Sequence, residues 1–287
     1  MTTICASPIF VGGYFKSGTS LLRALLRQHP EVAAGLETHW FAIDPQRQVG
    51  RHGESLDESI ARLAAFFQLD ETAIREATVD AKSGEMFLDR LMQLHVAAQN
   101  KTRWAEKTPD NILYVDRVFA HWPDARFVHI LRDLRDVYAS LNNCGKGGPP
   151  EVFAQAWSDW VSGGEAMGRV VGPDRFRTVL YADLVNHPAL VMRPIAEFLD
   201  LPWSPALTTF EGQRDEFDLV LRTTGKRSTT LESLSQPLFT DRVGVWKRDL
   251  EPTLLETLQG ELEKSGGWST YRRLCDAWGV IESREAV

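Results

Sequence analysis

Near its start the chain carries a short apolar run, Ile9 to Val11, that leads directly into a loop rich in glycine and serine. The run is typical of a strand that is buried on both faces of a parallel sheet. After the loop, leucines recur at helical spacing between Leu21 and Leu26, and His29-Pro30 ends the helix. A strand, a tight loop and a helix in this order bring backbone N–H groups together with the positive end of the helix dipole. The segment therefore predicts a site for phosphate or sulfate oxygens.

The loop itself reads Gly12-Gly13-Tyr14-Phe15-Lys16-Ser17-Gly18-Thr19-Ser20. Gly13 and Gly18 keep the spacing of the phosphate-binding loop G-x-x-x-x-G-K-[ST], but Thr19 stands where the lysine belongs. The lysine of this loop is Lys16, inside it. An ordinary structural turn is the alternative interpretation.

The string from Phe15 to Leu22 resembles the 5′-phosphosulfate-binding loop of sulfotransferases that use 3′-phosphoadenosine-5′-phosphosulfate (PAPS). In that loop Lys or Arg precedes Ser-Gly-Thr-[Ser/Thr]. The resemblance implies that the phosphosulfate is held by Lys16, Ser17, Gly18, Thr19 and Ser20. It also implies that Lys16 stabilises the leaving group, 3′-phosphoadenosine 5′-phosphate (PAP).

A second motif lies about 115 residues further on, where the apolar run from Arg126 to Leu131 predicts another buried strand. Arg132 follows this strand, and the guanidinium fork of an arginine suits a phosphate. Asp133 or Asp136 starts the predicted helix that carries Ser140. Arg132 and a serine eight residues later resemble the family's 3′-phosphate-binding segment. A solvated helix start is the alternative for this segment alone, and the two motifs together, in this order, carry the resemblance.

Two further segments match the family more weakly. Tyr181 ends a strand predicted to begin at Arg177, at a place where family members often contact the nucleotide. The alternative interpretation is an ordinary tyrosine at a strand edge. The string from Arg242 to Lys247 resembles the late loop that closes over the 3′-phosphate. It implies contacts from Arg242, Gly244 and Lys247. Residues 223–247 are interpreted as a lid over the cofactor, because their first part shows little periodicity.

In-line transfer depends on positioning and charge neutralisation, and an acceptor hydroxyl also needs a general base. The string from Gly35 to His39 resembles the Glu-Thr segment of tyrosylprotein and bacterial carbohydrate sulfotransferases, which implies Glu37 as the base. His39 is the reserve candidate, because histidine titrates near neutrality.

A third catalytic candidate, beside Glu37 and Lys16, is Lys107. Glu106-Lys107-Thr108-Pro109 resembles a segment of heparan and tyrosylprotein sulfotransferases in which the lysine approaches the acceptor or the transferred group. At the end of a short strand, Lys107 would stabilise equatorial oxygens in the transition state. Glu106 is expected either to orient Lys107 or to pair with it in a structural salt bridge.

Strands alternate with helices along the chain, which predicts an α/β fold, a P-loop-like parallel sheet with helices on both faces. One of these helices is expected to be capped near Asp110 or Asn111, and another is expected to follow the strand ending at Tyr181 and to continue through Leu199. The 287 residues suffice for a core without disulfides or metal. We expect one domain over 1–287, with a helical acceptor-side insertion at about 44–100 and the lid at about 223–247. Ligands of such sheets lie beyond the carboxyl ends of the strands, where the candidate residues fall.

The formal net charge of −7 argues against nucleic acid, heparin or an anionic membrane as a partner. No stretch approaches the ~18 apolar residues of a membrane span, and the first motif comes too early for a signal peptide. Cys5, Cys144 and Cys275 form no metal-like or redox-like pair, which indicates reduced thiols and a cytoplasmic protein. No metal is expected for this chemistry.

The sequence leaves the acceptor open: a small molecule, a carbohydrate or a lipid, with peptide tyrosine also allowed. It leaves the oligomeric state undetermined. One alternative to a PAPS-dependent sulfotransferase is a P-loop kinase that uses ATP and Mg²⁺, against which Thr19 argues. The other is a non-catalytic nucleotide-binding protein, against which Lys16, Glu37 and Lys107 together argue.

Overall fold

The computed structural model describes residues 7–279, so that Cys5 lies outside the described residues. At its centre is a parallel sheet with the strand order β2-β3-β1-β4-β5. The strands are β1 (Ile9–Gly12), β2 (Val32–Ala34), β3 (Arg103–Lys107), β4 (Arg126–Leu131) and β5 (Phe176–Leu180). The predicted α/β class, with helices on both faces of a parallel sheet, is confirmed.

In the middle of the sheet, β1 and most of β4 are apolar because both of their faces are buried. Ile9 and Val11 of β1 join one hydrophobic cluster, while Phe10 between them joins a cluster on the opposite face. In β4 the same alternation places Val128 in the first cluster and Phe127 in the second. The period of two residues therefore sorts each strand's side chains between two cores.

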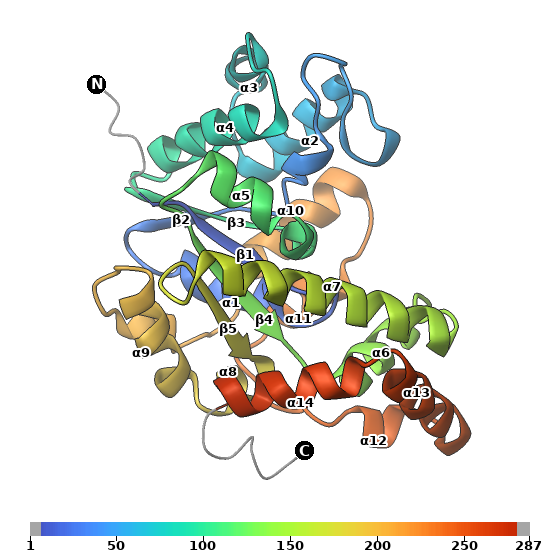
Figure 1. Cartoon of the computed structure of the whole chain (residues 1–287). Helices are drawn as coiled ribbons and strands as arrows, with labels where there is room; N and C mark the ends of the chain where they lie inside the picture. Colours follow the sequence, from blue (N-terminus) through green and yellow to red (C-terminus); the bar gives the residue numbers. More distant parts are fainter. Residues whose placement is uncertain (1–6, 280–287) are drawn as a thin grey trace.

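Helices pack against both faces of the sheet. The cluster around Ile9 and Val11 is completed by α1 (Thr19–Arg27), α9 (Pro188–Phe198) and α11 (Thr229–Leu234), and the opposite cluster by α2 (Leu56–Phe67), α4 (Gly84–Ala98) and α5 (Val115–His121). The other helices are α3 (Glu71–Thr78), α6 (Leu134–Asn142), α7 (Pro150–Val171), α8 (Tyr181–Asn186), α10 (Arg214–Thr224), α12 (Trp246–Asp249), α13 (Pro252–Lys264) and α14 (Gly267–Trp278). Short 3-10 helices are η1 (Trp40–Ala42), η2 (Arg51–Gly53), η3 (Pro109–Leu113) and η4 (Pro205–Leu207). Figure 1 shows α2, α3 and α4 together at one end of the molecule and α12, α13 and α14 at the opposite end.

The long helix α7 runs without interruption through Gly163-Gly164, although two glycines weaken a helix. A Cβ at Gly164 would lie 2.3 Å from side-chain atoms of Ile112 in η3, so the glycine lets the two segments approach closely. Among the described residues, no helix is both long and apolar enough to cross a lipid bilayer.

Three local expectations are wrong. The helix predicted to be capped at Asp110 or Asn111 is the 3-10 helix η3, because the Asn111 side chain turns inward and donates to the carbonyl oxygen of Val11 at 3.0 Å. The single helix expected after β5 is broken into α8 and α9 at Pro188, whose ring has no N–H to continue the ladder. The stretch 223–240, expected to be irregular, contains the helix α11, which the Ser228 side chain caps.

Candidate active site

All five strands of the described sheet run in the same direction, so their carboxyl ends form one edge. The candidate residues follow these ends. The glycine-rich loop follows β1, Glu37 follows β2, Lys107 is the last residue of β3, Arg132 follows β4, and Tyr181 follows β5. The sequence reading missed β2, whose only signal is the three-residue apolar run from Val32 to Ala34. This strand is what brings Glu37 to the common edge.

Gly18 fixes the shape of the loop. Its φ of 102° is disfavoured for other residues, and a Cβ there would lie 2.5 Å from Cδ2 of Tyr181. Gly18 also precedes α1, and no side chain of the described residues caps that helix. The N–H groups of the first turn of α1 are therefore open to an anion. Ser17 and Thr19 are buried beside them, and Ser20 is partly exposed.

Lys16 connects the loop to two distant segments. Its Nζ donates to Oγ1 of Thr230 in α11 at 3.3 Å, and its backbone has a positive φ of 63°. The carbonyl oxygen of Lys16 accepts a hydrogen bond from Arg132 at 2.8 Å. The two predicted cofactor motifs are therefore in direct contact. Thr230 belongs to the stretch interpreted as a lid, and the sequence analysis did not single it out.

Lys107 joins the loop to the proposed base. Its Nζ donates to Oγ of Ser20 at 3.0 Å and also forms an ion pair with Oε1 of Glu37. The Lys107 side chain is 4% exposed and that of Glu37 is 35% exposed. A buried ammonium group needs such partners, because an unpaired charge is costly to bury. Because the two residues are 70 positions apart in the sequence, no local sequence pattern predicts this contact.

The second oxygen of Glu37 faces His39. Oε2 of Glu37 lies 3.3 Å from Nε2 of His39, whose side chain is 7% exposed. Burial acts to raise the pKa of the Glu37 carboxyl, but Lys107 and His39 outweigh it, so this pKa lies far below its usual range. The structure thus places both base candidates, Glu37 and His39, beside each other and beside Lys107.

Glu106 does not interact with Lys107 as the sequence analysis expected. Adjacent residues of a strand point to opposite sides, and Glu106 points away from Lys107 into the interior. Its carboxylate accepts hydrogen bonds from Oγ1 of Thr38 at 2.8 Å, Oγ1 of Thr108 at 2.7 Å and Nδ2 of Asn111 at 2.6 Å. Both alternatives, orientation of Lys107 and a salt bridge with it, are wrong. The alternation of β3 was the signal that could have shown this.

At the other side of the edge, Arg132 is 7% exposed and lies over the ring of Tyr181 at 4.8 Å. Its Nη2 donates to the carbonyl oxygen of Arg242 at 2.6 Å. Its Nε is buried without a hydrogen-bond partner among the described residues. Burial lowers the pKa of Arg132 from its usual value. Ser140 lies further along α6 and is partly exposed.

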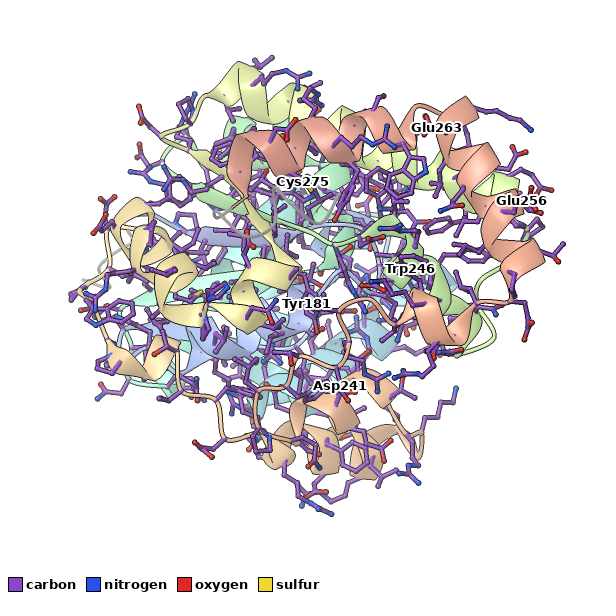
Figure 2. All side chains as sticks on the ribbon, turned by 90° about the horizontal axis from the view of Figure 1, so that it is seen from below. Tyr181, Asp241, Trp246, Glu256, Glu263 and Cys275 are labelled. Atoms are coloured by element: carbon purple, nitrogen blue, oxygen red, sulfur yellow. The ribbon has the colours of Figure 1, made fainter. Side chains whose placement is uncertain are left out.

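Asp136 ties the C-terminal loop to α6. Its carboxylate accepts hydrogen bonds from the backbone N–H of Gly244 at 2.8 Å and of Trp246 at 3.1 Å. The sequence analysis considered Asp136 only as a helix start, and α6 begins after Asp133 instead. Figure 2, which views the molecule from below, labels Tyr181 at the start of α8 and Trp246 at the start of α12.

The remaining predicted contacts from this loop are exposed. Arg242 and Lys247 point outward, and Nζ of Lys247 lies 5.6 Å from the ring centre of Trp246. Gly244 has a φ of 72°, and a Cβ there would meet open space. Within residues 7–279, no three His, Cys, Asp or Glu side chains gather in a way that would hold a metal ion.

Comparison with known protein families gives a match over residues 8–205 to the sequence model of the Sulfotransferase family. Among curated proteins, the chain is 30% identical over 209 residues to a protein-tyrosine sulfotransferase of Drosophila melanogaster, covering 71% of this chain and 40% of the relative. It is 26% identical over 260 residues to protein-tyrosine sulfotransferase 1 of Homo sapiens, covering 87% of this chain and 66% of the relative. The chain thus spans about half the length of several of the curated relatives that it matches.

Among solved structures, the fold is similar to the sulfotransferase domain from the curacin biosynthetic pathway. The TM-score is 0.64 at 20% identity, covering 92% of this chain and 98% of that domain. The sulfotransferase domain of the olefin synthase of Synechococcus PCC 7002 gives the same TM-score of 0.64 and covers 93% of this chain and 98% of that domain. At this level of identity the two domains support the fold alone.

Proposed function

Because the chain belongs to the sulfotransferase family, we propose that it transfers the sulfuryl group of PAPS to a hydroxyl or an amine of an acceptor. The donor fits the residues at the sheet edge. The uncapped N-terminus of α1 and the loop from Lys16 to Ser20 would receive the 5′-phosphosulfate. Arg132 would receive the 3′-phosphate through its unpartnered Nε, with a phosphate oxygen replacing one of the two carbonyl oxygens to which it now donates.

The other residues around the nucleotide follow from the same placement. Tyr181 lies against Gly18 and Arg132, and so joins the two phosphate sites. We propose that the 3′-phosphate site is completed by Ser140, Arg242, Gly244 and Lys247. Asp136 holds the loop from Arg242 to Lys247 in place through its two backbone hydrogen bonds.

The single observation that carries the proposal is the contact of Lys107 with both Ser20 and Glu37. It places the proposed base and a second cation against the end of the loop that would hold the sulfuryl group. In-line displacement needs this arrangement, because the acceptor oxygen and the leaving oxygen lie on opposite sides of the sulfur. Lys16 would neutralise charge on the leaving side, and Lys107 would neutralise the equatorial oxygens.

In this reaction the acceptor oxygen forms a bond to sulfur, and the bond from sulfur to the 5′-phosphate oxygen of PAPS breaks. The electron pair leaves with PAP, and the acceptor proton goes to Glu37. Glu37 can take this role because Lys107 binds its Oε1 and leaves Oε2 to accept the proton, and because its side chain remains 35% exposed.

The acceptor is proposed to bind beside Glu37, on the side of the helices within residues 44–100. This placement follows from the chain itself, since η1, η2 and α2 directly follow Glu37. The tyrosine sulfotransferase relatives make a tyrosine hydroxyl one acceptor to test, and a small-molecule hydroxyl is another. Carbohydrate and lipid acceptors belong to the same screen.

A calorimetric titration with PAP tests the donor. We expect metal-independent binding that weakens when adenosine 5′-phosphosulfate, which lacks the 3′-phosphate, replaces PAP. ATP with and without Mg²⁺ serves as the comparison. A response to ATP that requires Mg²⁺, with no response to PAP, would replace the proposal with a kinase.

Transfer from radiolabelled PAPS tests the base. Glu37→Gln removes the proton acceptor but keeps the shape of the side chain, so turnover should fall by about 100-fold or more while PAP affinity changes little. The matched control is Glu76→Gln, which replaces an exposed glutamate of α3 and should retain full turnover. Equal turnover of Glu37→Gln and the unmodified protein would refute the assignment.

A further inference from the structure

His39 is held in an unusual way. It is a non-glycine residue in the left-handed region, with a φ of 54°, just before η1. Its backbone N–H donates to Oγ1 of Thr108 at 3.3 Å, and the indole of the next residue, Trp40, donates to Asn111 at 2.9 Å. Strained backbone of this kind persists only where neighbouring contacts hold it in place, and it is found most often at functional sites.

The ring of His39 is buried, yet its polar atoms are not satisfied. Its side chain is 7% exposed, and neither ring nitrogen makes a hydrogen bond of good geometry to the residues described. Buried polar groups are normally paired, so an unpaired one calls for an explanation. The nearest polar atom in a recorded contact is Oε2 of Glu37, 3.3 Å from Nε2, on the side of Glu37 that Lys107 does not occupy.

A second histidine lies beside His39 on the side of the solvent. The ring centre of His52, in η2, lies 5.3 Å from that of His39, and His52 is exposed to solvent. Two other carboxyl groups lie near the rings. Asp110 of η3 has a buried Oδ2 with no hydrogen-bond partner among the described residues, and Glu54 acts on His52. The cations of the same neighbourhood are Lys107, Arg51 and Arg62, the last of which donates to the carbonyl oxygen of Glu37. Glu37, His39 and His52 thus lead from the site to solvent.

We propose that His39 takes over the acceptor's proton from Glu37, and that His52 passes it to solvent. This inference rests on the proposed sulfuryl transfer and adds a proton path to it. Glu37 alone is a poor final proton acceptor, because Lys107 stabilises its charged form. The imidazole of His39 is the next proton acceptor within reach, since its Nε2 lies 3.3 Å from Oε2 of Glu37.

The acceptor oxygen bonds to sulfur as the bond from sulfur to the 5′-phosphate oxygen breaks, and PAP leaves with the electron pair. The acceptor proton moves to Oε2 of Glu37 and then to Nε2 of His39, which becomes an imidazolium. This transfer restores the Glu37 carboxylate, and loss of the proton by way of His52 then restores the imidazole of His39. The net products are the sulfated acceptor, PAP and one proton.

The test is the pH dependence of turnover with radiolabelled PAPS. N-acetyltyrosinamide is one acceptor, and water, whose attack releases labelled sulfate, is the second. His39→Gln should lower the plateau of kcat/KM by about 100-fold, the lower end of what a positioned proton acceptor contributes. It should also change the shape of the pH profile of kcat/KM, because the side chain proposed to take over the proton is gone. PAP affinity should stay within about twofold of that of the unmodified protein. His121→Gln, an exposed change on α5, is the matched control and should leave both quantities unaltered.

His52→Gln gives an independent reading, because His52 is exposed and its replacement does not disturb the core. Its kcat should fall several-fold in dilute buffer and recover when imidazole is added, since a soluble base then carries the proton away. His39→Gln with the pH profile of the unmodified protein would overturn the inference. If His39→Gln fails to bind PAP, His52→Gln decides, and a kcat that is insensitive to both the mutation and imidazole overturns it.

Failure of the proposed function and failure of the proton path give different results. An unmodified protein that binds no PAP and releases neither labelled sulfate nor sulfated product contradicts the proposed function. An unmodified protein that is active, with a pH profile unchanged by loss of His39, contradicts the proton path alone.

Discussion

Glu106→Gln is the sharpest test of how the fold holds the site. Glu106 is 1% exposed, and its carboxylate accepts four hydrogen bonds. Three of them, from the backbone N–H of Thr38 and from the hydroxyls of Thr38 and Thr108, go to Oε1. The fourth comes from Nδ2 of Asn111 to Oε2. The substitution keeps the shape of the side chain and replaces one acceptor oxygen by an NH₂ group.

The size of the effect follows from this geometry. A glutamine oxygen can keep the three bonds at the Oε1 position, but its NH₂ group then faces the NH₂ group of Asn111, where 2.6 Å now separates donor from acceptor. Asn111 does not rotate away easily, since its Oδ1 accepts from Trp40 and its Nδ2 also donates to Val11. The loss of one charge-assisted bond, with a buried donor left unpaired, predicts a decrease of about 2–4 kcal/mol in the free energy of unfolding. Relief from burying a charge offsets part of the loss and keeps the estimate below the sum of four bonds.

The measurement is urea unfolding followed by circular dichroism, with Glu76→Gln as the exposed control that should change the free energy of unfolding by less than about 0.5 kcal/mol. Thr38 is bound by Glu106 and is next to Glu37, so turnover of Glu106→Gln should fall as well. A free energy of unfolding within about 0.5 kcal/mol of that of the unmodified protein would refute the reasoning. It would mean that the hydrogen bonds of the buried Glu106 carboxylate do not stabilise this edge of the sheet.

Further outcomes follow from single sites. Gly18→Ala should destabilise the protein by about 2–4 kcal/mol and abolish PAP binding, because it combines a disfavoured φ of 102° with a Cβ 2.5 Å from Tyr181. Gly163→Ala in α7, where a Cβ meets no atom within 4 Å, should be neutral or stabilise by up to about 1 kcal/mol, and thermal unfolding compares the two. Arg132→Ala should weaken PAP binding by at least about 10-fold but leave that of adenosine 5′-phosphosulfate nearly unchanged, and equal losses for both ligands in calorimetry would contradict the 3′-phosphate assignment. The pKa of the Glu165 carboxyl lies below its usual value. Burial alone would raise this pKa, but the hydrogen bonds from His129 and Thr178 outweigh the effect of burial. Glu165 therefore stabilises the fold above about pH 4.3, and this contribution is lost as the pH falls through the lowered pKa. Urea midpoints measured between pH 3 and pH 7 should decline less for Glu165→Gln, and parallel curves would exclude this role.

Much of the site was readable in the sequence because its elements are local. The strand, loop and helix around Lys16 lie within some twenty residues, and the strand before Arg132 is apolar apart from Arg126 and His129. The period of two residues in β1 and β4 needs no distant partner to be recognised. Whether Ser140, Arg242 and Lys247 touch a nucleotide stays a prediction, since their resemblance to a known segment places them no further than the same edge.

Other parts lay beyond a local reading. The sequence analysis found Glu37 and Lys107 separately, but the pairing of β2 with β3 is what brings them together. The short β2 is stable only as a neighbour of β3, so its own three residues carry almost no signal. The break at Pro188 was visible in the sequence and was overlooked. The helix α11 was not visible in the sequence, because it is short and its apolar residues Leu231 and Leu234 are stabilised by packing on α10 and on the distant helix α1.

The sequence by itself determined the class of fold, the order of the two anion-binding motifs and the residue types that could carry charge in the reaction. Tertiary structure decided which of those residues meet. Thr230 comes to Lys16 from a helix 214 residues away, His39 comes to lie between Glu37 and His52, and Glu106 turns from Lys107 toward Thr38. The physical reason is that local periodicity and turn chemistry act over a few residues. The partner of a buried charge is chosen instead by the packing of the whole core, which leaves no room for a charge without one.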